Sequence, residues 1–113
     1  MLSKRYRFHS RGGIRYTYQK GKTLRSPSLS LVFAPNERGH QRFAVVVSKK
    51  VLKSAVGRNR IRRRVFEAIR LELPNFKTKQ DSIFVVFNAD VQKMPFAELQ
   101  RVIHQLLLDS AEK

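Results

Sequence analysis

The stretch VGRNRIRRRVFEAIR, residues 56–70, constrains the fold of this chain because it combines an apolar side with a strongly cationic side. On a helix that advances about 100° per residue, Ile61, Val65, Ala68 and Ile69 fall on one side. The stretch also holds six arginines and one glutamate, whereas a solvated helix usually mixes charges for pairing one turn apart. The pattern predicts a helix that packs through one side and offers arginines to a polyanion from the other.

The whole chain carries the same excess of positive charge. Its 113 residues include 24 Lys and Arg against 8 Asp and Glu, a net charge of +16, which is far more than solubility requires. Such a charge concentrates polyanions at the surface, so nucleic acid is the first candidate partner and an anionic membrane the second. With 42% hydrophobic residues, 8 of them Phe, the chain is predicted to fold as one domain, residues 1–113, and not as a disordered basic tail.

Several classes of protein are disfavoured by what the sequence lacks. It has no cysteine, which argues against a disulfide framework and fits a cytoplasmic location. No apolar run is long enough to predict a membrane span. The basic N-terminus is not followed by an apolar segment, so it does not resemble a secretory signal, although an Arg-rich and acid-poor start is also typical of organelle presequences.

Hydrophobic periodicity predicts an α+β fold with one sheet of roughly four strands. The turn-forming residues 35–41 predict a hairpin between the first two strands, and the strand–helix–strand run that follows predicts a parallel crossover. Helices are expected to cover one face of the sheet. The predicted elements are a helix at 12–22, strands at 28–34 and 42–48, the basic helix after an N-cap at Ser54 and before Pro74, a strand at 82–89, a helix from Pro95, and a further short strand near Leu24 or before Arg42.

The basic helix is the predicted nucleic-acid contact. Arginine is better suited than lysine to bidentate phosphate binding and to stacking on bases. Asn59 either reads a base edge or 2′-hydroxyl or helps the helix to start, and Gly57 either marks the first turn or lets a ligand backbone approach. A strand, not a second helix at a tight turn, precedes the basic helix, which favours structured RNA over a DNA groove.

No catalytic site is predicted within the chain. The acidic residues are scattered, and Asp81 and Asp90, which bracket a predicted strand, are interpreted as turn residues. The three histidines, His9, His40 and His104, are far apart in sequence, and no metal site is predicted. Aromatic residues among basic ones form either a stacking surface for single-stranded RNA or part of the core; these are Tyr6, Phe8, Tyr16 and Tyr18.

Residues 47–70, VSKKVLKSAVGRNRIRRRVFEAIR, resemble the signature of the bacterial ribonuclease P protein component. That signature is a strand ending in S-K-K, a short connection, and a helix opening with A-V-x-R-N-R-I-x-R. The remainder of the chain agrees more loosely. The matching positions are Ser48, Lys49, Lys50, Ala55, Val56, Arg58, Asn59, Arg60, Ile61 and Arg63.

The resemblance implies the function of a subunit. Members of the family are the small basic protein of the ribonucleoprotein that removes the 5′ leader from precursor tRNA. It implies two partners, the ribonuclease P RNA subunit and precursor tRNA, with no obligatory protein partner and no membrane. Phosphodiester hydrolysis, and the magnesium it needs, are expected on the RNA subunit. The alternatives are a ribosomal or other structural RNA-binding protein and an autonomous nuclease.

The resemblance also implies a fold and two sites. The fold is an α-β sandwich with a left-handed β-α-β crossover. Phe66 stands where the family often has a basic residue, and Arg64 is the candidate for the missing charge. The residues expected to bind the RNA subunit are Lys49, Lys50, Arg58, Asn59, Arg60, Arg62, Arg63 and Arg64, and those expected to line a cleft for the leader are Ile14, Tyr18, Val32 and Phe33.

Overall fold

A four-stranded mixed sheet forms the centre of the computed structural model, which describes residues 2–8, 11–36 and 39–112. The strand order is β1-β2-β4-β3; β1, β2 and β4 are antiparallel, and β3 runs parallel to β4. Helix α2 connects β3 to β4, which confirms the predicted crossover. The strands are β1 (Lys22–Arg25), β2 (Leu29–Pro35), β3 (Arg42–Val47) and β4 (Gln80–Val86).

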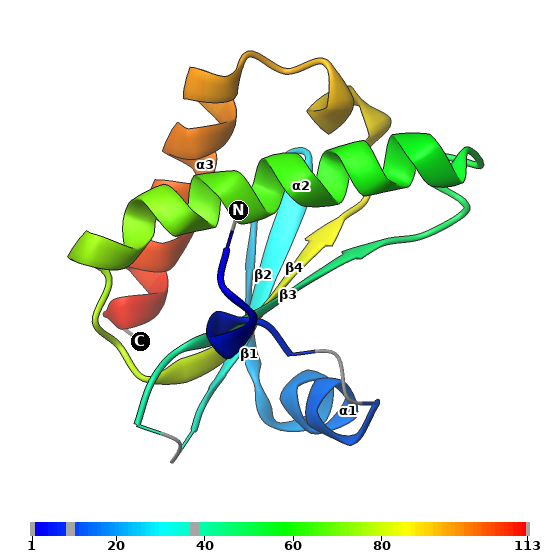
Figure 1. Cartoon of the computed structure of the whole chain (residues 1–113). Helices are drawn as coiled ribbons and strands as arrows, with labels where there is room; N and C mark the ends of the chain where they lie inside the picture. Colours follow the sequence, from blue (N-terminus) through cyan, green and yellow to red (C-terminus); the bar gives the residue numbers. More distant parts are fainter. Residues whose placement is uncertain (1, 9–10, 37–38, 113) are drawn as a thin grey trace.

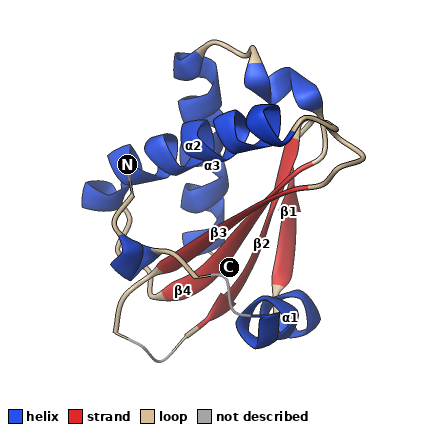
Figure 2. Ribbon diagram, turned by 45° about the vertical axis from the view of Figure 1, so that its right-hand side comes forward, coloured by secondary structure: helices blue, strands red, loops and turns tan. Residues whose placement is uncertain are grey.

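Helices lie on both faces of this sheet. Figures 1 and 2 show α2 and α3 across one face and α1 on the other side of the strands. The expectation that helices cover a single face is therefore wrong for α1. The apolar run of β2 explains the difference, because every residue from Leu29 to Ala34 is buried and the strand needs cover on both sides. The helices are α1 (Arg11–Lys20), α2 (Ala55–Glu72) and α3 (Phe96–Ala111), with 3₁₀ turns η1 (Lys4–Tyr6), η2 (Leu73–Asn75) and η3 (Ala89–Gln92).

The predicted hairpin between β2 and β3 is wrong, because β4 is inserted between them. Ala34 of β2 and Arg42 of β3 both pair with Asp81 of β4. A turn signal is local and does not reveal a strand inserted from about forty residues further along the chain. Positions 37 and 38 of the predicted turn lie outside the described residues.

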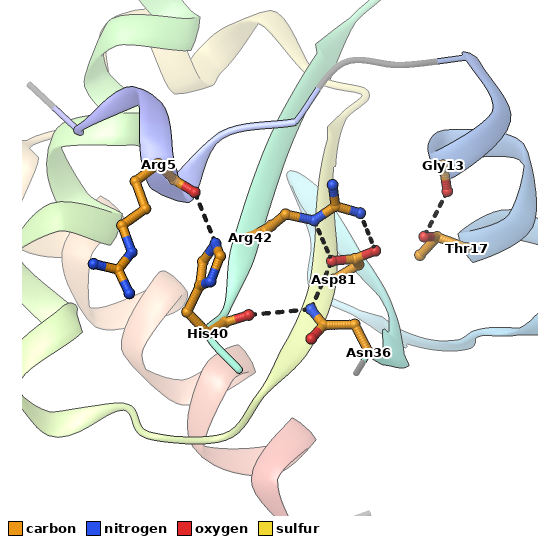
Figure 3. Close-up of polar contacts among 7 residues, drawn as sticks. All are labelled: Arg5, Gly13, Thr17, Asn36, His40, Arg42 and Asp81. Atoms are coloured by element: carbon orange, nitrogen blue, oxygen red, sulfur yellow. Dashed lines mark hydrogen bonds and ion pairs between the residues drawn. The ribbon is translucent and has the colours of Figure 1, made fainter. Parts of the chain in front are cut away.

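Asp81 joins the three strands at this end of the sheet and is not a turn residue. It is only 7% exposed, and its carboxylate accepts hydrogen bonds from Arg42 Nε (2.9 Å) and Nη2 (2.7 Å) and from Asn36 Nδ2 (2.8 Å). Figure 3 shows these contacts together with the carbonyl of His40, which also accepts from the Asn36 amide. A buried carboxylate needs such partners, and Arg42 supplies the compensating charge.

Helix α2 begins as the sequence predicts. Ser54 is the N-cap, and its side chain accepts a hydrogen bond from the Gly57 amide at 3.1 Å. Gly57 is buried, and a Cβ there would lie 2.4 Å from Leu52 Cδ2. The close approach at Gly57 therefore comes from the protein itself. The four predicted apolar positions, Ile61, Val65, Ala68 and Ile69, are each 0% exposed.

Gly21, between α1 and β1, gives a test of how tightly α1 is held. A Cβ at this position would lie 2.4 Å from the Thr17 carbonyl oxygen and 2.6 Å from that of Phe33, and neither backbone atom can move alone. We expect Gly21→Ala to lower the free energy of unfolding by about 1–3 kcal/mol in urea denaturation. Gly12→Ala is the matched control, because a Cβ at Gly12 would have no described atom within 4 Å. Equal stability of the two variants would contradict the prediction.

Candidate nucleic-acid interface

The outward side of α2 presents arginines that no described side chain neutralises. Arg60 and Arg63 are exposed, and so are Lys49 and Lys50 in the turn that precedes the helix. Among the described residues none of these four makes a hydrogen bond or ion pair. Their charges are therefore available to an anion from outside the chain.

Three more predicted contact residues, Arg58, Asn59 and Arg62, make hydrogen bonds within the chain. The Nη1 atom of Arg58 donates to the carbonyls of Leu52 (2.9 Å) and Lys53 (2.8 Å), which fastens the preceding connection to the helix. Arg62 Nη2 donates to Asn59 Oδ1 at 2.5 Å. Asn59 is exposed inside the helix and is not its N-cap, so the interpretation that it helps the helix to start is not supported.

Arg64 is turned toward the protein itself. Its Nη1 donates to the carbonyls of Val91 (2.6 Å) and Gln92 (2.8 Å), and its Nη2 donates to the carbonyl of Met94. These bonds tie α2 to the segment around η3. Arg64 therefore does not supply charge beside Phe66.

Arg7 from the N-terminal segment supplies the charge near Phe66. Its guanidinium carbon lies 5.8 Å from the centroid of the Phe66 ring. Its Nε atom is buried and has no hydrogen-bond partner within the described part of the chain. The backbone places it there, since Arg7 bridges to Phe43 and the Phe8 amide donates to the Phe43 carbonyl at 3.0 Å. Because this pairing joins segments far apart along the chain, no local pattern could have predicted it.

Glu67, the acid of the basic stretch, pairs with Arg70. Both Nε and Nη2 of Arg70 donate to Glu67 Oε1, the former at 2.7 Å. The hydrogen bond from Arg70, together with its positive charge, lowers the pKa of Glu67, and the same hydrogen bond with the negative charge of Glu67 raises the pKa of Arg70. The pair lies in the C-terminal part of α2 and includes neither Arg60 nor Arg63.

A groove of about 470 Å³ lies beside the sheet edge formed by β3. We call it the β3 groove. Its apolar lining comes from β3, α1, α2 and Phe8 of the N-terminal segment, and its cations come from the N-terminal segment and from α2. No acidic residue is among the described residues that line it. These lining residues are Lys4, Arg7, Phe8, Ile14, Ala44, Val45, Val46, Arg62 and Phe66.

The four residues predicted for a leader cleft do not share one surface. Val32 belongs to the apolar cluster on the α1 side of the sheet, and Ile14 packs against that cluster. Tyr18 is 46% exposed, and partial burial raises the pKa of its phenol above the ordinary value. Phe33 is 5% exposed in the core on the α2 side. Placing Phe33 in the cleft was wrong, because successive residues of a strand face opposite sides.

Phe8 lines the β3 groove and is a core residue. The sequence had left open whether it belongs to a stacking surface or to the core. Phe8 is 5% exposed, lies in the cluster with Val32, and has the Arg42 guanidinium carbon 4.7 Å from its ring centroid. Tyr16 and Tyr18 are the exposed members of the predicted aromatic group, at 55% and 46%. Tyr6 is half-buried and lies edge-on to His40.

The described histidines do not converge on a reaction centre. His104 Nδ1 lies 2.6 Å from Glu72 Oε1, where it links α3 to α2, and His40 Nε2 lies 3.1 Å from the carbonyl of Arg5. His9 lies outside the described residues. Within residues 2–8, 11–36 and 39–112 no three His, Cys, Asp or Glu side chains gather as metal ligands would. No described helix has the length and apolar character needed to cross a membrane.

Known proteins are similar to this chain in sequence and in fold. The family model for ribonuclease P matches residues 2–110. The ribonuclease P protein component of Chloroflexus aurantiacus is 41% identical over 94% of this chain and 78% of its own length, and that of Roseiflexus castenholzii is 34% identical over 94% and 86%. The solved ribonuclease P protein of Thermotoga maritima superposes with a TM-score of 0.80 at 21% identity, covering 89% of this chain and 94% of that one.

The fold, the exposed Arg residues on one side of α2 and the exposed Lys residues in the turn before it define a small basic α+β protein with a cationic surface. The match over nearly the whole chain makes the assignment specific: the chain belongs to the family of bacterial ribonuclease P protein components. The same comparisons support the prediction that this chain is the protein subunit of an endoribonuclease, and they do not support the alternative of a ribosomal protein.

The Phe33→Ala variant tests whether Phe33 is a core residue or a binding residue. Truncating a buried Phe costs about 3–5 kcal/mol of unfolding free energy, and we expect a loss of that size in urea denaturation. Tyr18→Ala, on a half-exposed ring, should cost less than about 1 kcal/mol. A Phe33→Ala protein as stable as the wild type would show that Phe33 is not part of the core.

Proposed function

We propose that this chain binds the RNA subunit of ribonuclease P through the arginine side of α2, binds the 5′ leader of precursor tRNA through the α1 side of the sheet, and so promotes removal of the leader. The observation that carries the proposal is the set of exposed cations without partners in the described structure. The cations meant are those on the outward side of α2 and in the turn before it: Lys49, Lys50, Arg60 and Arg63.

Contact with the RNA subunit is electrostatic in this proposal. Arg60 and Arg63 lie one turn apart on α2, so they can contact neighbouring phosphates of a folded RNA. Each phosphate neutralised releases condensed counterions, which makes binding depend steeply on salt. Hydrolysis, and the magnesium ions that assist it, belong to the RNA subunit, and this chain contributes binding and orientation.

The leader is proposed to follow the α1 side of the sheet toward the β3 groove. Tyr18 offers a neutral, half-exposed ring for stacking, and Ile14 and Val32 lie on the same side. Lys4 and Arg7 at the groove can neutralise leader phosphates. Arg62 lines the groove from α2, so the leader site adjoins the proposed contact with the RNA subunit.

Reconstitution with a bacterial ribonuclease P RNA tests the proposal. Labelled precursor tRNA should stay intact with the protein alone and should be cleaved at lower magnesium when both subunits are present than with the RNA alone. Cleavage by the protein alone would show an autonomous nuclease. Binding to the RNA without any change in magnesium requirement would favour a structural RNA-binding protein.

Salt dependence tests the arginine side of α2. We expect Arg60→Ala and Arg63→Ala each to flatten the log–log plot of RNA-subunit affinity against salt by roughly 0.7–0.9, because each removes one phosphate contact. The matched control is Arg101→Ala, an exposed arginine on α3. Filter binding over a range of salt concentrations measures the slopes. Slopes equal to that of the Arg101 variant would place Arg60 and Arg63 outside the interface.

Leader length tests the role of Tyr18. We expect Tyr18→Ala to weaken holoenzyme binding of precursor tRNA with a long leader by about 1–3 kcal/mol, the value of one stacked base, and to leave binding of leaderless tRNA unchanged. Tyr16→Ala is the control, because Tyr16 is exposed on the same helix but points about 200° away. Equal losses for both substrates would argue against leader stacking at Tyr18.

A further inference from the structure

We propose that a notch between α2 and η3 is a further phosphate-binding site for RNA, in which Lys93 joins Arg60 and Arg63. We further propose that Arg64 is the positioning residue that holds Lys93 there. Both statements rest on the proposed function and extend it to a segment outside the basic stretch of the sequence.

The α2–η3 notch has a volume of about 440 Å³ and is lined by cations from two separate parts of the chain. Lys93 follows η3 directly and is exposed, and among the described residues its side chain has no hydrogen-bond or ion-pair partner. No acid belongs to the described lining of the notch. That lining consists of Arg60, Arg63, Arg64, Gln92 and Lys93.

Arg64 fixes this arrangement. Its guanidinium donates to three carbonyls that flank Lys93 in sequence, those of Val91, Gln92 and Met94. The carbonyls at the end of a helical turn carry partial negative charge, so an arginine is a favourable cap for them. Because the Arg64 guanidinium donates to backbone carbonyls, it contributes to the notch chiefly by holding Lys93 in position.

The acid nearest to Lys93 in sequence is held by other contacts. Asp90 Oδ2 accepts a hydrogen bond from Ser28 Oγ at 3.1 Å, at the start of β2, and its backbone amide donates to Asn88 Oδ1 at 3.0 Å. Asp90 does not line the notch. No described residue that lines the notch therefore offsets its three cations, and an external anion would relieve their mutual repulsion.

A phosphodiester chain suits this site better than an acidic peptide. Arg60 and Arg63 present planar guanidinium groups that match phosphate oxygens in pairs, and Lys93 adds a point charge on a flexible stem. The notch continues the side of α2 that the proposed function assigns to the RNA subunit. One RNA strand could therefore contact the helix and the η3 segment together.

The first test compares two exposed lysines in binding to a bacterial ribonuclease P RNA. Lys93→Ala should flatten the log–log salt slope by roughly 0.7–0.9, as expected for one lost phosphate contact, and Lys77→Ala should leave the slope unchanged. Lys77→Ala removes the same charge from another exposed position, which lies outside the notch. Equal slopes for the two variants would overturn the site at Lys93.

The second test uses Arg64→Lys, which keeps the charge and removes the three-carbonyl contact. It should flatten the slope by as much as Lys93→Ala does, and the double variant should show no further change. Additive changes would mean that Arg64 does not act through Lys93. Circular dichroism and thermal melting confirm that the variants are folded, and the Lys93→Ala comparison stands alone if Arg64→Lys does not fold.

Failure of the notch can be told apart from failure of the proposed function. If the wild type binds the RNA subunit and Arg60→Ala flattens the slope while Lys93→Ala does not, only the notch is overturned. If the wild type does not bind that RNA, both fail. An effect of Lys93→Ala on an acidic peptide but not on the RNA would assign the notch to a protein partner and overturn its RNA role.

Discussion

Burial of one side of α2 is the constraint on which the rest of this structure depends. Ile61, Val65 and Ile69 are fully buried, and each contributes about 1.5–3 kcal/mol relative to an exposed side chain. Repulsion between like charges one turn apart costs only about 0.2–0.5 kcal/mol a pair. The free energy gained by burying the apolar side exceeds the repulsion between the arginines. The helix therefore forms without a bound anion and holds Arg60 and Arg63 on its exposed side.

Four arginines of α2 form two groups by what surrounds them. Arg58 and Arg64 donate to backbone carbonyls and hold neighbouring segments in place, whereas Arg60 and Arg63 point away from the protein. Arginine serves both purposes because its guanidinium has five donors and stays charged. The structural arginines thereby give the outward ones a rigid support, which favours binding without a large cost of ordering.

Much of the fold and part of the site could be predicted from local patterns. The N-cap at Ser54, the apolar side of α2 and the strands around Val32 and Val45 follow from spacing and residue type, which act over a few residues. The resemblance to ribonuclease P proteins also rested on a continuous stretch, residues 47–70. The hairpin before Arg42 failed because the answer needed a distant partner, the inserted β4. Phe33 failed for a local reason, because it was grouped with Val32 although neighbouring residues of a strand face opposite sides.

The sequence by itself determined that a cationic amphipathic helix follows a buried strand and that its outward charge calls for a polyanion. Only the tertiary structure decided that β4 separates β2 from β3, that Arg7 reaches Phe66, and that Arg64 faces the η3 carbonyls while Lys93 joins the exposed arginines. Periodicity reports which side of an element is apolar. It carries no information on which distant segment that side meets, because the choice depends on the packing of the whole chain.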